Sequence, residues 1–227
     1  MGLNGTMTSP ATRTYNARRG RMGSGRVDAT VRLLPRFGLP GGPLDREVVF
    51  GRHAPVVLEI GSGMGEATVA MASADPGRDY IAVEVYTAGL ANLLRLVDAA
   101  GLANIRTHHG DAMALLRDRI EPASLDAIHV FFPDPWPKMR HRKRRLIETV
   151  WVSLIVDRIR PGGVLHCATD DAGYAADMLA LLGATPVLAN LHSGFAPRPA
   201  YRPETRYERR GRRAGRRSYD LIFRRLH

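Results

Sequence analysis

The chain has 227 residues and a formal net charge of +11, from 33 Lys and Arg against 22 Asp and Glu. Its length suffices for one α/β domain with a full core, and 44% hydrophobic residues is ordinary for such a domain. A lone cysteine, Cys167 in an apolar run, excludes an intrachain disulfide. The first residues lack the apolar core of a signal peptide, and no later segment approaches the ~20 apolar residues of a membrane span. We therefore expect a cytoplasmic protein without membrane association.

The basic charge is concentrated in three segments. Residues 13–36 hold seven Arg and one acid, residues 138–145 hold six Lys or Arg and no acid, and residues 202–217 hold eight Arg and two acids. The rest of the chain carries 12 basic and 19 acidic residues, so its charge is negative. A basic segment can be a merely solvated surface. Three separate clusters, two of them deep inside the chain, favour a polyanionic partner, above all nucleic acid.

The first part of the chain is rich in Gly, Arg, Thr and Pro and has little hydrophobic periodicity. Such a segment cannot build a core by itself. We predict a flexible Arg-rich arm over residues 1–43, in which Val31 to Phe37 could pack against the body. A single folded domain over residues 44–227 follows.

A predicted buried strand, Val56 to Ile60, runs directly into a glycine-rich turn. Residues 61–65 read Gly-Ser-Gly-Met-Gly, and an apolar-periodic helix follows. Glycine permits φ > 0 and the close approach of a ligand to the main chain, so the turn indicates a nucleoside site, although a plain tight turn would look the same. The third glycine comes one residue too early for the dinucleotide fingerprint, and Glu66 would repel a diphosphate. Glu59 and Glu66 favour a cationic ligand, so S-adenosylmethionine fits better than NAD.

Two further strands bring acidic residues to the same edge of the sheet. Tyr80 to Val85 is the second strand and contains Glu84, whose charge is costly in an apolar strand unless it is paired. At the end of the second strand of an open α/β sheet, a carboxylate faces the ribose of a bound nucleoside. The third strand, Asn104 to His109, leads to Asp111, which could be a helix N-cap, an adenine contact or both.

The fourth strand, Leu125 to Phe132, leads into Pro-Asp-Pro-Trp-Pro-Lys at residues 133–138. Three prolines fix φ and remove backbone donors, which predicts a stiff loop at the carboxyl end of a central strand, where ligands bind in doubly wound sheets. We predict that this loop holds Asp134 at the ligand. The alternative is that Trp136 fills the core and Asp134 caps the next helix.

A basic run, Met139 to Arg145, follows the proline-rich loop. We predict that it opens a helix whose apolar positions begin at Leu146. Basic residues at a helix N-terminus are disfavoured by the helix dipole, and the phosphate backbone of RNA or DNA would offset that cost. The prediction places nucleic acid beside the methyl donor.

Together these motifs resemble the bacterial tRNA (guanine-N7)-methyltransferase family. The resemblance extends from about Val56 to Phe223 and rests on the glycine turn, Glu84-Val85, the proline-rich loop with its basic run, residues 168–171 (Ala-Thr-Asp-Asp) and residues 205–211. It implies an α/β, Rossmann-like class I methyltransferase fold, with helices on both faces of a seven-stranded, mostly parallel sheet and one antiparallel strand near the C-terminus. It also implies methyl transfer from S-adenosylmethionine, without a metal, to N7 of the variable-loop guanine at tRNA position 46.

The resemblance assigns roles residue by residue. The methyl-donor contacts are Glu59, Gly61, Gly63, Gly65, Glu84, Asp111 and Asp134, and Asp134 is also the catalytic position. The substrate contacts are Lys138, Asp170, Thr205, Arg206, Tyr207 and Glu208. The RNA-facing strip is Arg140, His141, Arg142, Lys143, Arg144 and Arg145. The sequence departs from the family pattern at Arg216, where many members have His, and at Tyr207, where Phe is common.

Methylation of guanine N7 determines what the site must supply. N7 carries a free lone pair, so attack on a sulfonium methyl needs positioning and charge complementarity but no general base. We expect Asp134 to hold the guanine through its N1-H and exocyclic amine, with Asp170 as a second candidate for that edge. Asp171 is expected to cap a helix from Ala172. Since N7 lies in the deep groove of A-form RNA, the target base must leave its stack.

Two alternatives remain. An exocyclic-amine methyltransferase also has a proline-rich tetrapeptide after its fourth strand, and a non-catalytic RNA-binding scaffold could keep the same fold. The sequence leaves open whether the protein is a monomer or a homodimer.

Overall fold

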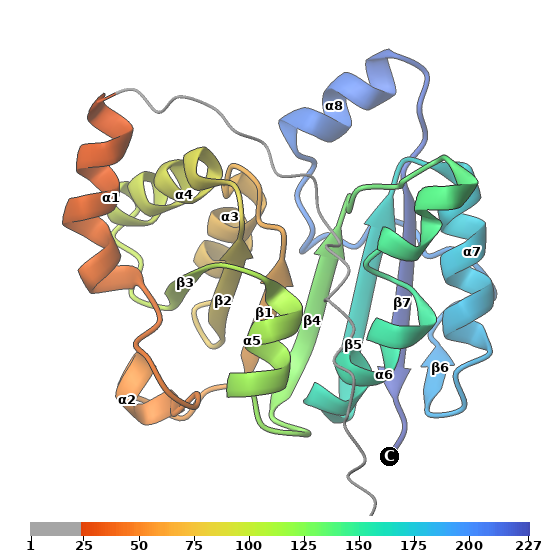
Figure 1. Cartoon of the computed structure of the whole chain (residues 1–227), viewed down its shortest axis with the longest axis horizontal. Helices are drawn as coiled ribbons and strands as arrows, with labels where there is room; N and C mark the ends of the chain where they lie inside the picture. The colour runs from red at the N-terminus through yellow and green to blue at the C-terminus, as the bar shows by residue number, and fades with distance from the viewer. Residues whose placement is uncertain (1–23) are drawn as a thin grey trace, which may run out of the picture.

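The computed structural model describes residues 24–227, which form a seven-stranded sheet with helices on both faces (Figure 1). The strands are β1 (Val56–Ile60), β2 (Asp79–Glu84), β3 (Ile105–His109), β4 (Leu125–Phe131), β5 (Ile159–Thr169), β6 (Leu188–Asn190) and β7 (Tyr219–Arg225). The helices are α1 (Ser24–Phe37), α2 (Arg46–Phe50), α3 (Glu66–Ala74), α4 (Thr87–Ala99), α5 (Ala112–Arg119), the 3-10 helix η1 (Met139–Arg144), α6 (Thr149–Arg158), α7 (Ala172–Gly183) and α8 (Arg206–Arg213). Among the described residues, no helix has the length and apolar character needed to cross a bilayer.

The sheet has the strand order β3-β2-β1-β4-β5-β7-β6. Strands β1 to β5 pair in parallel, whereas β7 is antiparallel to β5 and β6. This confirms the predicted mostly parallel sheet with an antiparallel strand near the C-terminus. The direction of strand order reverses between β1 and β4, and open α/β sheets bind ligands in the crevice at the carboxyl ends of the strands at such a point. The glycine turn and the proline-rich loop therefore lie on opposite sides of one crevice.

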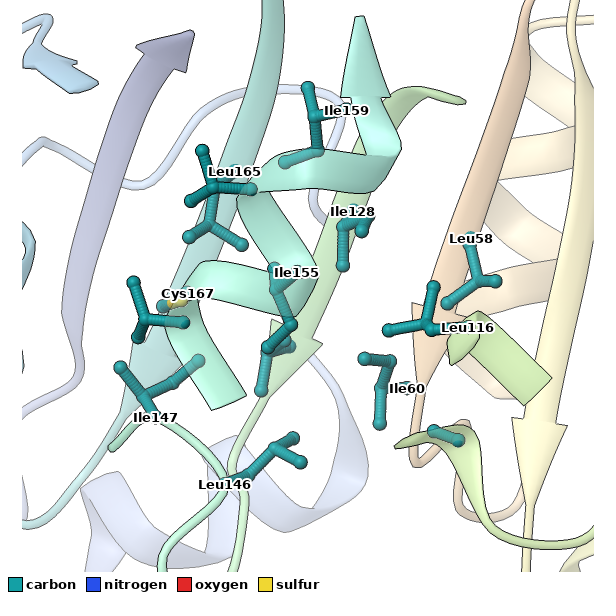
Figure 2. Packing of buried hydrophobic residues seen from close by; sticks show 14 of the residues in the cluster. Leu58, Ile60, Leu116, Ile128, Leu146, Ile147, Ile155, Ile159, Leu165 and Cys167 are labelled. Carbon is teal, nitrogen blue, oxygen red and sulfur yellow. The ribbon is translucent and has the colours of Figure 1, made fainter. Parts of the chain in front are cut away.

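Apolar side chains cover both faces of the sheet. Strands β1, β2 and β4 are buried along their whole length, as is usual for a parallel sheet between two layers of helices. One cluster joins the sheet to α5, α6 and α7, and the other joins it to α1, α3 and α4. Figure 2 shows Leu116 of α5 and Ile155 of α6 packed against the sheet in the first cluster. Cys167 is buried there, as predicted.

The predicted flexible arm is partly replaced by a helix. Residues 1–23 lie outside the described residues, but residues 24–37 form α1, which packs against α4 and β3. Ala29, Leu33 and Phe37, four residues apart, are buried, while Val31 is 71% exposed. Packing of the segment from Val31 to Phe37 against the body is thus confirmed through Leu33 and Phe37, and the ordered helix begins earlier than predicted, at Ser24.

The basic run does not open the long helix that the sequence predicted. It forms η1, whereas α6 begins only at Thr149, after Glu148 has capped it by accepting a hydrogen bond from the Val150 N–H at 3.4 Å. An acid at the N-terminus suits the helix dipole and a cluster of arginines opposes it, so the helix starts beyond the basic run. Leu146 and Ile147, in the link between the two helices, are buried against the sheet (Figure 2).

Candidate active site

The turn between β1 and α3 requires its glycines. Gly61, Gly63 and Gly65 have φ of 79°, 58° and 81°, in the left-handed region that favours glycine. A Cβ on Gly65 would lie 2.8 Å from Cα of Leu93 in α4. Asn92, also in α4, donates a hydrogen bond to the Met64 carbonyl at 2.7 Å. The turn is therefore held in a fixed shape against α4, with its main chain facing the crevice.

Two buried carboxylates lie at neighbouring strand ends, where the sequence predicted them. Glu59 on β1 is 2% exposed and accepts a hydrogen bond from the Thr68 hydroxyl, and burial raises its pKa to about 7. Glu84 on β2 accepts hydrogen bonds from the N–H groups of Gly63 and Tyr86 at 2.6 and 2.7 Å. Burial raises the pKa of Glu84 as well. Since an ionised carboxylate offers about four acceptor sites, Glu84 can also accept hydrogen bonds from a ligand.

Two hollows meet in the crevice between β1 and β4. The first, about 220 Å³, extends between Glu84 and Gly110, and the second, about 680 Å³, extends from Glu59 to residues 205–207. Both are bounded by residues 131–134, so Asp134 lies where they join. Buried acids at both ends suit a ligand with cationic groups and hydroxyls, and they oppose a diphosphate. The residues therefore fit S-adenosylmethionine.

The proline-rich loop is held on both sides of Asp134. Phe132, with φ of 51°, donates its N–H to the Ala168 carbonyl on β5 at 2.7 Å, and Trp136 has φ of 41°. Trp136 is 9% exposed, with the Arg144 guanidinium 5.0 Å from the centre of its ring. Trp136 thus packs under the basic run. The alternative that Asp134 caps the next helix is wrong, because η1 begins after Lys138 without a side-chain cap and Glu148 caps α6.

Two other predicted site residues lie beside the crevice. Asp111 caps α5 by accepting hydrogen bonds from the N–H groups of Met113 and Ala114, which confirms its predicted capping role. Its neighbours Gly110 and Ala112 line the first hollow, and an additional adenine contact stays a prediction. Lys138 is exposed at the start of η1, and its substrate contact also stays a prediction.

Helix α8 closes the far side of the second hollow, above the carboxyl ends of β4 and β5 (Figure 1). Thr205 begins the helix in a capping box, in which its hydroxyl accepts the Glu208 N–H at 3.1 Å and the Glu208 carboxylate accepts the Thr205 N–H. Thr205, Arg206 and Tyr207 line the hollow, as the predicted substrate contacts require. Glu208 does not: it is 6% exposed and points into the protein. The prediction of a substrate contact by Glu208 is therefore corrected to a structural role.

A buried polar network explains the position of Glu208. Arg202 donates to both carboxylate oxygens of Glu208 on α8 at 2.7 and 2.8 Å, and to both of Asp220 on β7 at 2.6 and 2.8 Å. Its guanidinium also lies 5.6 and 5.5 Å from the ring centres of Phe131 and Phe132, which form the wall of both hollows. Arg202 thus joins α8, β7 and the entry to the proline-rich loop. Nothing in the sequence indicated this role for Arg202, because the only local signal nearby is the capping box of Thr205 and Glu208.

Comparison with known proteins identifies the family. A family described as putative methyltransferase matches residues 53–221. A tRNA (guanine-N(7)-)-methyltransferase of Streptomyces avermitilis is 50% identical, over 94% of this chain and 75% of the relative. A protein of the same name from Paraburkholderia xenovorans is also 50% identical, over 94% of this chain and 83% of the relative. The chain belongs to the tRNA (guanine-N7)-methyltransferase family.

Solved structures confirm the fold of this tRNA methyltransferase family member. The 16S rRNA methyltransferase KamB superposes with a TM-score of 0.61 at 15% identity, over 82% of this chain and 96% of KamB. The antibiotic-resistance methyltransferase Kmr gives 0.56 at 16% identity, over 84% of this chain and 97% of Kmr. At this identity the likeness concerns the fold, and it supports the predicted class I methyltransferase architecture.

The two departures from the pattern of the tRNA methyltransferase family meet at one carboxylate. Asp170, at the end of β5, accepts hydrogen bonds from the Tyr207 hydroxyl at 3.1 Å and from Arg216 Nε at 2.7 Å. A chain with Phe at position 207 and His at position 216 could not make these two contacts with Asp170, because Phe has no hydroxyl and His has no guanidinium group. In this chain Asp170 therefore ties α8 to the sheet, and its predicted contact with guanine stays a prediction. Asp171 caps α7 by accepting the Tyr174 N–H at 2.7 Å, as predicted.

Most of the predicted RNA-facing strip is exposed, but its last residue is buried. Arg140, Arg142, Lys143 and Arg144 are exposed and His141 is half-buried. Arg145 is 5% exposed, donates to the Pro135 carbonyl at 2.8 Å and pairs with Asp177. Arg145 therefore braces the proline-rich loop from inside, which corrects its predicted place on the RNA-facing surface.

Gly89→Ala is expected to weaken donor binding without touching the donor. A Cβ at Gly89, in α4, would lie 2.3 Å from the Gly63 carbonyl oxygen. Gly63 would have to move and lose its hydrogen bond to Glu84, so we expect the affinity for S-adenosylhomocysteine in calorimetry to fall about ten-fold or more. Gly183→Ala, at the end of α7 with no atom within 4 Å of the added Cβ, is the control. Equal affinity in the two variants would contradict this account.

Proposed function

We propose that this protein transfers the methyl group of S-adenosylmethionine to N7 of a guanine in tRNA, at variable-loop position 46. The observation that carries the proposal is the acid-lined crevice between β1 and β4, in which Asp134 lies at the junction of the two hollows. Family membership supports the reaction, and the three basic segments of the chain suit a polyanionic substrate. The proposal includes a cytoplasmic location. Light scattering would distinguish a monomer of 25.0 kDa from a homodimer.

Glu84, Glu59 and Asp134 each have a separate role in methyl transfer. Glu84 accepts hydrogen bonds from the ribose hydroxyls in the first hollow, and Glu59 faces the cationic amino-acid end of the donor in the second. The N7 lone pair forms the new N–C bond as the C–S bond breaks, the electron pair of that bond stays on sulfur, and no proton moves. Positive charge thereby passes from sulfur to the base. Asp134 accepts the N1-H and amino hydrogens of guanine and stabilises the cation that develops.

The deciding experiment is transfer of labelled methyl from S-adenosylmethionine to unmodified tRNA, followed by aniline cleavage. Aniline cuts only where N7-methylguanine has weakened the glycosidic bond, so cleavage in the variable loop is the expected result. Incorporation without cleavage would favour the exocyclic-amine methyltransferase. No incorporation, together with no heat of S-adenosylhomocysteine binding in calorimetry, would favour the non-catalytic scaffold.

Donor binding is expected to strengthen as the pH rises towards neutrality. Because burial raises the pKa of Glu59 to about 7, the side chain is largely protonated at pH 5.5 and must lose its proton to face a cation. The affinity for S-adenosylhomocysteine should therefore rise by up to about ten-fold per pH unit below 7 and level off above it. Calorimetry between pH 5.5 and 8 measures this dependence. Glu59→Gln should flatten the profile between pH 5.5 and 7, and a flat wild-type profile there would refute the assigned role.

A further inference from the structure

The exposed side of α8 carries four arginines around a third hollow. Arg206, Arg209, Arg210 and Arg213 surround it together with Tyr207, and its volume is about 500 Å³. At about 100° per residue these arginines fall within an arc of about 100° on the helix. Glu208 and Gly211, on the other side of the helix, are buried. The helix is thus fixed by one side and presents a stripe of cations on the other.

This stripe has a surplus of positive charge. Arg209 donates to the Glu204 carbonyl at 3.0 Å, and within the part of the chain whose side chains are described no carboxylate pairs with Arg206, Arg210 or Arg213. Four guanidinium groups that line one hollow repel one another unless an anion lies among them. Guanidinium groups match phosphate oxygens through paired N–H donors, and Arg is common at phosphate sites for that reason.

The hollow on α8 adjoins the methyl-transfer site. Arg206 and Tyr207 line both it and the second hollow, which also contains Asp134. From Arg206 to Arg213 the stripe is about 10 Å long, enough for more than one phosphate of a single strand. A base that reaches Asp134 through the second hollow would leave its ribose and phosphates at this stripe. Holding the backbone there would help to keep the base out of its stack.

We propose that the arginine stripe of α8 binds the phosphates that flank the target guanosine of the RNA. This inference rests on the proposed function, because it takes the guanine to lie at Asp134. It assigns to Arg209, Arg210 and Arg213 a role in holding the RNA strand, distinct from the strip at residues 140–144.

The test compares two arginines of the same helix. Arg213→Gln removes a charge from the stripe, whereas Arg212→Gln removes the same charge from a side chain that is 71% exposed, pairs with Glu204 at 2.9 Å and lies outside the hollow. We expect Arg213→Gln to lower the slope of log K against log salt for tRNA binding by about 0.7 to 0.9, and Arg212→Gln to leave it nearly unchanged. Equal changes in the two variants would overturn the proposal, since they would reflect net charge alone.

Phosphate ethylation locates the contact on the RNA. Ethylated phosphates beside the target guanosine should weaken binding to the wild-type protein, and Arg213→Gln should lose this sensitivity at one of them. No interference at those phosphates in the wild type would also overturn the proposal. The proposed function is judged separately: aniline cleavage by wild-type protein alongside equal salt slopes would refute the stripe alone, whereas absence of cleavage would refute the reaction.

Discussion

Asp134→Asn is expected to lower kcat for tRNA methylation by on the order of 100-fold or more while changing the affinity for S-adenosylhomocysteine only a few-fold. Asp134 lies where the two hollows join, on a loop held by its prolines and by the hydrogen bond from Phe132 to Ala168. Asparagine has nearly the same shape but carries no charge to stabilise the cation that develops on guanine. Its amide would also place a donor where the base itself donates. The loss should therefore appear in the chemical step, measured by single-turnover methyl transfer at saturating tRNA and donor.

Asp118→Asn is the control for this variant. Asp118 lies at the exposed end of α5 and pairs only with its neighbour Arg117 among the described residues, so both kcat and donor affinity should keep their wild-type values. If Asp134→Asn weakened donor binding as much as it lowered kcat, Asp134 would be a donor ligand without a role towards the base.

Arg202→Met is expected to have the largest effect on stability. Arg202 is 1% exposed and bonds Glu208 and Asp220, which are themselves buried. Removing the guanidinium leaves two buried carboxylates without their cation, a loss of about 3–5 kcal/mol. For a chain of this size that corresponds to a fall in Tm on the order of 10 °C. KM for tRNA should rise at temperatures well below Tm, because α8 would lose its anchor to β7.

Two further variants make the Arg202 prediction decisive. Arg202→Lys keeps the charge but cannot make the same set of hydrogen bonds, so Tm and KM for tRNA should lie between those of Arg202→Met and the wild type. Arg78→Met removes an arginine from a largely exposed pair with Asp75, where the loss should stay below about 1 kcal/mol. Similar Tm values for Arg202→Met and Arg78→Met would show that the network contributes little.

Much of the candidate site was predictable because its signals are local. A glycine repeat after a buried strand, an acid within an apolar strand and three prolines in one loop restrict the backbone over a few residues, so Gly61, Glu84 and Asp134 could be placed at strand ends from sequence. The four strands predicted up to Phe132 agree with β1 to β4 to within one residue at each end. The two capping residues, Asp111 and Asp171, were found for the same reason.

The incorrect predictions concern residues whose surroundings are set by the tertiary fold. Helix α1 depends on a surface formed by α4 and β3, about 60 or more residues later, so the sequence indicated only its second half, Val31 to Phe37, as a segment that could pack. Arg145 and Glu208 look like surface charges in the sequence. Arg145 is nevertheless buried against the Pro135 carbonyl, with the exposed Asp177 as its counter-charge, and Glu208 meets Arg202 inside the protein. Burial of a charge depends on whether the fold supplies a counter-charge, and sequence spacing does not reveal that.

The class of fold, the buried acids near the ends of β1 and β2, and the stiff loop that carries Asp134 could all be predicted from the amino acids alone. This was possible because glycine, proline and buried acids constrain the backbone where they stand. Which charged residues are exposed and which hold the protein together depends on the tertiary structure. Arg202, Glu208 and Asp220 lie close together in the chain but in a loop, in α8 and in β7, and their charges become a single buried network only when α8 docks on the sheet.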